Sequence, residues 1–173
     1  MPVSLREVRS SVEGRRWMER VFPEYVDSLT AGLSHTGKYP VFSEGGYQSD
    51  LLSGWFKDDS SIPLVLMKQD RPVGFAVIAK PAGQWRSQVD YRMSEFFIIA
   101  SSRRLGVGRE AAELIFKRFA GRWEIVENAT NKNSIAFWRS VVRACSAGQF
   151  RERIENGEVR QYFDSSPMRP TPR

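Results

Sequence analysis

The chain has 173 residues, 41% of them hydrophobic and 27% charged, which is the balance of a folded globular domain rather than of a disordered chain. No stretch approaches the roughly 18 consecutive apolar residues that a membrane span requires, and residues 1–11 lack the apolar run of a secretory signal. Cys145 is the only cysteine, which excludes an intrachain disulfide and a cysteine-rich zinc site. We therefore expect a cytoplasmic protein that makes no contact with a membrane.

The chain is basic, with a formal net charge of +6 and an isoelectric point of about 9.8. Such a charge attracts anionic partners, among which are nucleic acids, membrane surfaces and phosphorylated cofactors. The basic residues are scattered, apart from short clusters at Arg15–Arg16 and Arg103–Arg104. A solvated basic surface is therefore the favoured interpretation, and a nucleic-acid partner stays an alternative.

The hydrophobic pattern, followed in chain order, predicts a mixed α/β sheet. The predicted strands are 4–8, a hairpin over 62–81, 91–100, 122–126, and a closing hairpin over 149–166 around Asn156-Gly157. The predicted helices are 14–33, 50–56, a segment after Gly108 with its apolar stripe at Ala112, Ile115, Phe116 and Phe119, and 133–148. Pro23 should break or kink the first helix. Segments 34–50 and 83–90 are predicted loops.

These elements predict a single domain over residues 1–164, followed by a disordered tail at 165–173. Residues 91–100, with the sequence YRMSEFFIIA, are almost continuously apolar in their second half, as expected of a central buried strand. The turn that follows this strand carries the chemistry.

The turn contains two arginines and two glycines, Arg103-Arg104-Leu105-Gly106-Val107-Gly108, and leads directly into a predicted helix. Glycines let backbone N–H groups approach a ligand without an intervening Cβ. The start of the helix adds partial positive charge, and Arg103, Arg104 and Arg109 add full charges. The sequence therefore predicts a phosphate-binding turn rather than a merely flexible helix start.

Residues 106–111, GVGREA, also fit the dinucleotide pattern G-x-G-x-x-A, with Glu127 about 20 residues beyond as the ribose-binding acid. In dinucleotide-binding folds, however, the strand runs straight into the first glycine. Here the five residues ASSRR separate Ile99 from Gly106, and the chain after Gly108 ends in a hairpin. A dinucleotide-dependent oxidoreductase is therefore only a remote alternative.

The segment Arg103–Gly108 resembles the [Q/R]-x-x-G-x-[G/A] motif of the GNAT superfamily of N-acetyltransferases. Residues 131–142, NKNSIAFWRSVV, resemble that family's N-x-x-A-x-x-[LF]-[YW] helix, with Ser134 in the alanine place. The order of elements is also similar, over about residues 3–164. The resemblance implies an α+β fold in which a twisted, mainly antiparallel sheet of six or seven strands contains a central splayed parallel pair. About four helices would flank the sheet.

The resemblance also implies acetyl-CoA as cosubstrate, with no metal. The turn residues Arg103, Arg104, Leu105, Gly106, Val107, Gly108 and Arg109 would hold its pyrophosphate. The backbone of Phe96, Phe97 and Ile98 would pair with the pantetheine arm and polarise the thioester carbonyl. Phe137 and Trp138 would flank the arm, and Asn131 would hydrogen-bond to it. Core packing is an equally good interpretation of the two aromatic residues.

A base must deprotonate the attacking amine. Strict alternation would place Tyr91, Met93, Glu95, Phe97 and Ile99 on one face of their strand, with Glu95 as the lone charge. Burial would raise the pKa of Glu95 toward neutrality, which suits a general base. The alternatives are a salt bridge, for example to Arg92, or a bulge that turns Glu95 outward.

The general acid is less well defined by the sequence. The resemblance places Trp138 where many relatives have a tyrosine acid, and an indole N–H does not serve as an acid. Tyr91 or solvent would protonate the thiolate, or it would leave unassisted, because a thiol with a pKa of about 8.5 is a tolerable leaving group. The candidates for the acceptor pocket are His35, Tyr47, Trp55, Phe56 and Trp85.

The predicted function is transfer of an acetyl group from acetyl-CoA to a primary amine of a small molecule or peptide, by direct attack in a ternary complex. A module that binds acetyl-CoA and regulates a partner without catalysis is one alternative, and an enzyme acting on an amine linked to tRNA or another nucleic acid is a second. The sequence leaves open both the acceptor and the choice between a monomer and a homodimer.

Overall fold

The computed structural model describes residues 2–33, 46–83 and 88–166. Within these ranges the chain forms seven strands and four α-helices. Its elements are β1 (Val3–Glu7), α1 (Val12–Leu33), α2 (Gly46–Lys57), β2 (Ser61–Lys68), β3 (Arg71–Ala79), β4 (Tyr91–Ile98), α3 (Val107–Arg118), β5 (Arg122–Asn128), α4 (Lys132–Cys145), β6 (Phe150–Glu155) and β7 (Glu158–Asp164). The predicted order of strands and helices is confirmed.

The strands form one sheet in the order β1-β2-β3-β4-β5-β7-β6. Among the described strands, only β4 and β5 pair in parallel, and all other neighbours are antiparallel. This topology confirms the predicted mixed, mainly antiparallel sheet. It also excludes the doubly wound parallel sheet that a dinucleotide-binding domain requires.

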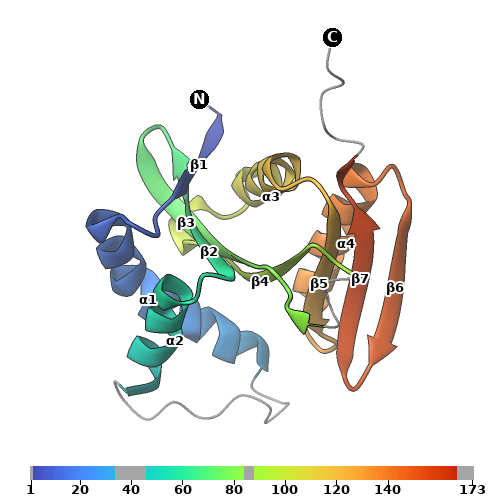
Figure 1. Cartoon of the computed structure of the whole chain (residues 1–173), viewed down its shortest axis with the longest axis horizontal. Coiled ribbons are helices and arrows are strands. Elements are labelled where there is room, and N and C mark those ends of the chain that lie inside the picture. Colours follow the sequence, from blue (N-terminus) through green and yellow to red (C-terminus); the bar gives the residue numbers. More distant parts are fainter. Residues whose placement is uncertain (1, 34–45, 84–87, 167–173) are drawn as a thin grey trace.

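The parallel pair is short. Residues Tyr91–Met93 of β4 pair with Trp123–Ile125 of β5, and the pairing of these two strands ends there. From that point the two strands diverge (Figure 1). The second half of β4 therefore pairs with β3 and not with β5. We call this opening the fork. The predicted splay of the central pair is confirmed.

Helices cover both faces of the sheet, because β2 and β3 are apolar at nearly every position and need burial on both sides. One core cluster joins α1 and α2 to one face, with Met18, Trp55 and Phe75 among its members. The other cluster joins α3 and α4 to the opposite face through residues such as Phe116 and Trp123. Figure 1 shows α1 and α2 together on one side, away from α4.

Of the two predicted effects of Pro23, a break is wrong, since α1 runs from Val12 to Leu33 with Pro23 inside it. An interior proline removes one backbone hydrogen bond and costs about 3 kcal/mol. Residues on both sides of it, Met18, Phe22, Tyr25 and Val26, are buried in the same core cluster. Tertiary packing of this stripe therefore outweighs the local cost.

Several predicted boundaries shift. The first hairpin turns at Gln69-Asp70, both with positive φ, so β3 already begins at Arg71. Helix α2 begins at Gly46, four residues before its predicted start. Ser165, placed in the tail by the predicted domain boundary, is buried, and its hydroxyl donates to the carbonyl oxygen of Phe116. Ser165 therefore packs against the domain. The Asn156-Gly157 turn is confirmed, with φ of 52° and 76°.

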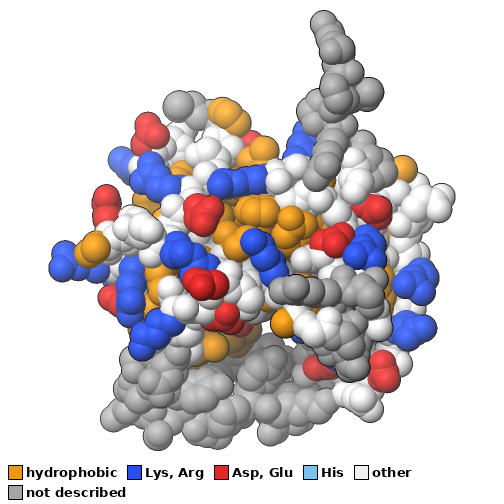
Figure 2. Space-filling view, in the orientation of Figure 1, with side chains coloured by type: hydrophobic (Ala, Val, Ile, Leu, Met, Phe, Trp, Pro, Cys, Tyr) orange, Lys and Arg blue, Asp and Glu red, His pale blue; other side chains and the backbone are white. Residues whose placement is uncertain are grey.

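No helix among the described residues is long and apolar enough to cross a membrane. On the face shown in Figure 2, lysine and arginine side chains lie among acidic ones and do not gather into one patch.

Candidate active site

The glycine turn presents free backbone N–H groups. Arg104 and Gly106 adopt left-handed conformations, with φ of 60° and 74°, and α3 begins immediately afterwards at Val107. The amide of Glu110 donates to the carbonyl oxygen of Gly106. The preceding amides, Val107 to Arg109, therefore have no acceptor within the helix. These amides and the helix dipole direct partial positive charge out of the turn, which suits an anion.

Arg103 ties this turn to the end of β4. Its Nε donates a hydrogen bond of 2.8 Å to the carbonyl oxygen of Ile98, and its guanidinium lies 5.5 Å from the ring centre of Phe97. Arg109 bonds to Glu113 and to Ser140 of α4, while Leu105 is exposed. Two arginines of the predicted cluster, Arg103 and Arg109, therefore hydrogen-bond to neighbouring protein groups and help to position the turn.

Gly108 faces the open end of the fork. A Cβ at this position would lie 3.5 Å from Cγ1 of Ile98 and 3.5 Å from the ring of Phe137. The glycine turn, the end of β4 and the first half of α4 therefore meet at one point. The sequence predicted each of these three parts, and the fold brings them together.

Only some backbone groups of β4 are free to hydrogen-bond to a ligand in the fork. The amide of Ile99 donates to Val73 on β3, and Phe97 pairs with Phe75 in the same antiparallel ladder. Since hydrogen-bonded residues alternate along a strand, Glu95, Phe97 and Ile99 direct their backbone groups to β3, and Phe96 and Ile98 direct theirs into the fork. This is a correction for Phe97, whose backbone does not face the fork. The Ile98 carbonyl already accepts from Arg103.

Aromatic side chains close the α4 side of the fork. The ring of Phe96 stacks on Phe137 at 5.9 Å and meets Trp138 edge-on at 5.0 Å. Trp138 is buried, while Phe137 is partly exposed. Asn131 caps α4, its side-chain oxygen accepting from the Ser134 amide at 3.1 Å. Among the described residues, no acceptor takes the hydrogens of the Asn131 amino group.

A cavity of about 150 Å³ occupies the fork, and we call it the fork cavity. It is lined by residues of β4, β5, α1 and the start of α4: Tyr25, Leu29, Met93, Ser94, Glu95, Phe96, Ile125, Val126, Glu127, Asn128, Asn131, Ser134 and Trp138. These described lining residues include two carboxylates, Glu95 and Glu127, and no lysine or arginine. The described lining therefore offers carboxyl groups and no cationic side chain to a bound molecule.

Glu95 follows a β-bulge. The β3–β4 register shifts so that Val77 faces Glu95 while Ile78 faces Met93, which leaves Ser94 without a partner residue in the ladder. The predicted strict alternation is therefore wrong. Tyr91 and Met93 pack on the α3–α4 side, whereas Phe97, two residues from Glu95, belongs to the α1–α2 cluster. The bulge turns Glu95 away from the face of Met93, and it still lines the fork cavity.

Burial raises the pKa of Glu95 to about 8. The alternative of a salt bridge to Arg92 is wrong, because Arg92 binds the buried carboxylate of Glu124 at 2.9 Å. Arg160 also binds this carboxylate, at 3.1 Å. Arg92 and Glu124 face each other where β4 and β5 are still paired, so their ion pair lies at the closed end of the fork.

Tyr91 lies outside the fork cavity. Its ring packs on Phe119 and Trp123, 5.7 Å and 5.1 Å between ring centres. The tyrosine that does line the cavity is Tyr25 of α1, which also packs edge-on against Phe97. Sequence reasoning missed Tyr25 because it shares the apolar stripe of its helix with Phe22 and Val26 and looks like an ordinary core residue.

The structure assigns a packing role to two further residues considered from the sequence, Trp55 and Cys145. Trp55 is buried and packs on Phe22 and Phe75, so it belongs to the core. His35 and Trp85 lie outside the described residues. Cys145 is buried, which raises the pKa of its thiol to about 11 and leaves it a poor nucleophile at neutral pH.

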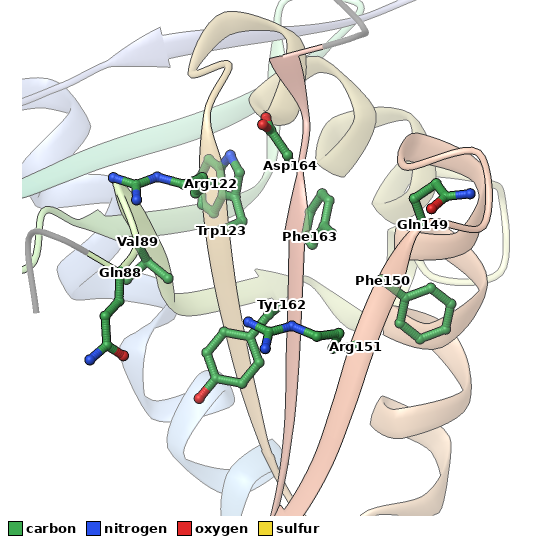
Figure 3. Close-up of a pocket in the computed structure, with 10 residues that line it drawn as sticks. All are labelled: Gln88, Val89, Arg122, Trp123, Gln149, Phe150, Arg151, Tyr162, Phe163 and Asp164. Atoms are coloured by element: carbon green, nitrogen blue, oxygen red, sulfur yellow. The ribbon is translucent and has the colours of Figure 1, made fainter.

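A second cavity, of about 360 Å³, lies at the opposite end of the strands, near the beginnings of β4 and β5 (Figure 3). Its charged groups are engaged: Arg122 binds Asp90, and the guanidinium of Arg151 lies 5.6 Å from the ring centre of Tyr162. It contains none of the residues predicted to hold a cosubstrate.

The fold described above is that of a GNAT acetyltransferase. A family model described as the acetyltransferase (GNAT) family matches residues 19–141, and the chain belongs to that family of N-acetyltransferases. No curated protein is similar enough to be matched.

Solved structures of the same fold include an acetyltransferase from Thermus thermophilus, with 18% identity and a TM-score of 0.68 over 95% of this chain and 97% of that one. The PaiA N-acetyltransferase from Thermoplasma acidophilum, in complex with coenzyme A, has 12% identity and a TM-score of 0.59 over 95% and 99%. A spermidine N-acetyltransferase chimera from Vibrio cholerae and hSSAT has 15% identity and a TM-score of 0.62 over 96% and 98%.

Proposed function

We propose that this protein transfers the acetyl group of acetyl-CoA to a primary amine by direct attack within a ternary complex. The observation that carries the proposal is the position of the fork cavity. Its partly buried Glu95 lies beside backbone groups of Phe96 that face the fork, and the glycine turn opens at the same end of β4. The coenzyme A complex of a structure with the same fold supports the choice of cosubstrate.

The cosubstrate would bind from the glycine turn inward. The amides of Val107, Gly108 and Arg109 would hold the diphosphate, with Arg103 and Arg104 adding positive charge. A groove between α3 and α4, lined by Arg109, Arg139 and Arg143, lies beside the turn and would accept the remaining phosphate of the nucleotide. The pantetheine arm would pass Phe137 and enter the fork.

Chemistry would take place at the bulge in β4. An amide hydrogen of Phe96 or Ile98 pointing into the fork would stabilise negative charge developing on the thioester oxygen. Glu95 would take the proton of the attacking ammonium, for which a pKa near 8 is well matched to neutral pH. The thiolate would leave unassisted, or Tyr25 would supply its proton in place of Tyr91.

The acceptor is a primary amine. The described lining of the fork cavity has no basic side chain to repel a cation, and Glu95 can take the proton of an ammonium group, which favours an acceptor that arrives as a cation. The spermidine acetyltransferase of the same fold is consistent with such an acceptor class.

Release of free thiol from acetyl-CoA in the presence of a panel of amines tests this function. Thermal stabilisation by coenzyme A and by NAD is measured in parallel. We expect turnover with at least one amine and stabilisation by coenzyme A. Stabilisation by coenzyme A without turnover on any amine would favour a regulatory module, and stabilisation by NAD alone would contradict the proposal.

A further inference from the structure

Glu127, near the end of β5, is 6% exposed and lines the fork cavity. In the described part of the chain, three buried side-chain atoms lack a hydrogen-bond partner: the two carboxylate oxygens of Glu127 and Oε1 of Gln161. Buried polar groups are normally hydrogen-bonded, and those that are not require a specific explanation. The glycine-turn chemistry described above makes no use of Glu127.

Among the residues that the structure describes, no cation neutralises Glu127. Arg139 of α4 and Glu152 of β6 act on the pKa of Glu127 in opposite directions, but Arg139 donates two hydrogen bonds, of 3.0 Å and 2.6 Å, to Glu152. On β7, Gln161 donates its amino group to Glu152 as well. The other ionisable groups that line the cavity are Glu95 from β4 and Tyr25 from α1. Burial raises the pKa of Glu127 to about 8, so at pH 7 it is mainly a neutral carboxyl with an O–H donor.

The two walls of the fork differ in what they offer. On the β4 wall, the backbone of Phe96 presents both a donor and an acceptor. On the opposite wall, formed by the end of β5 and the start of α4, Asn131 keeps two amino hydrogens after capping its helix, and Glu127 has its hydroxyl. This wall therefore offers hydrogen-bond donors, which complement amide carbonyl oxygens.

We propose that Glu127 recognises the pantetheine arm, its neutral carboxyl donating a hydrogen bond to an amide carbonyl of the arm inside the fork. This inference rests on the proposed function, since it needs the arm to occupy the fork. It assigns Glu127 to cosubstrate binding rather than to proton transfer. Ionisation of Glu127 removes the donor, so binding of the arm weakens as the pH rises above about 8.

The test measures dissociation constants at pH 7 and pH 9.5 for two probes. Acetyl-CoA carries the arm and has no thiol to ionise, and adenosine 3′,5′-bisphosphate lacks the arm. All proteins carry Glu95→Gln, because Glu95 titrates in the same range and lines the same cavity. Glu127→Gln keeps a neutral donor at both pH values, and Glu127→Leu removes it. Melting temperatures of each protein are recorded alongside.

We expect the Glu95→Gln protein to lose about tenfold in affinity for acetyl-CoA between pH 7 and pH 9.5, the worth of one hydrogen bond. Adding Glu127→Gln should leave the affinity at pH 7 within about twofold and remove the pH dependence. Adding Glu127→Leu should weaken acetyl-CoA binding about tenfold at pH 7. The affinity for the bisphosphate should not change.

An unchanged pH dependence in the Glu127→Gln protein would overturn the inference. So would equal losses for both probes in Glu127→Leu, which would show that Glu127 supports the structure of the site and does not contact the arm. If the parent protein binds neither probe, the proposed function itself fails, and this result is distinct from the other two.

Discussion

The α-carbon of Gly108 faces the ring of Phe137, and a Cβ on it would lie 3.5 Å from Cε2 and Cζ of that ring. The first turn of α3 and the middle of α4 are therefore in contact across the mouth of the fork. Any side chain longer than a methyl group at residue 108 has to enter the path that we assign to the cosubstrate.

Gly108→Glu should abolish measurable binding of coenzyme A while the protein stays folded. The change places a bulky side chain and a negative charge beside the amides that would hold the diphosphate. Isothermal titration with coenzyme A measures the loss. Gly54→Glu is the matched control, since Gly54 lies in α2 and a Cβ added to it would have nothing within 4 Å. Equal affinity in both variants would contradict the assignment of the turn.

Glu95→Gln should lower turnover by about 10²-fold or more, with little change in the affinity for acetyl-CoA, because a glutamine cannot accept the proton of the amine. In the unaltered protein, kcat/KM should rise with pH until about 8, where Glu95 becomes ionised. Steady-state kinetics between pH 6 and pH 9.5 check both expectations. Glu13→Gln, which alters an exposed glutamate at the start of α1, is the control. Undiminished turnover in Glu95→Gln would remove Glu95 from the mechanism.

Stability should fall with rising pH because of Glu95 and Glu127. Each has a folded pKa of about 8 against an ordinary value of 4.5, so between these values the folded chain holds protons that the unfolded chain has released. The free energy of unfolding therefore decreases as pH rises through this window. Melting temperatures from pH 5 to pH 9 should show a shallower decline in the double variant Glu95→Gln/Glu127→Gln. Parallel curves would contradict the buried pKa values.

Glu124→Gln should destabilise the fold by about 3 kcal/mol, because it removes the buried carboxylate that Arg92 and Arg160 share and leaves Arg160 only its pair with Glu158. Denaturant unfolding measures this difference. Glu19→Gln breaks an exposed pair with Arg15 on α1 and should cost about 0.5 kcal/mol or less. Equal effects of the two substitutions would show that the ion pair at the closed end of the fork contributes no more than a surface pair.

The sequence was a good guide wherever local chemistry decides the structure. The positive φ values at Asn156-Gly157 follow from residue types that tolerate them, as the hairpin prediction required. The amphipathic helices likewise follow from their spacing. These local features, together with the resemblance to a family, were enough to predict the fold and the position of the turn.

Features set by long-range packing were not predictable. The bulge at Ser94 depends on how β3 and β4 align, and it moved Glu95 to a different face from Met93. The burial of Tyr25 in the wall of the fork cavity depends on where α1 lies against β4. Helix α1 continues through Pro23 because its apolar stripe packs against the sheet, and helix propensities do not include such tertiary contacts.

A crystal structure with bound coenzyme A tests the central claim most directly. We expect diphosphate oxygens within hydrogen-bonding distance of the Val107, Gly108 and Arg109 amides, and the sulfur inside the fork beside Phe96. A nucleotide bound instead in the cavity between Arg122 and Arg151, with the fork empty, would contradict it.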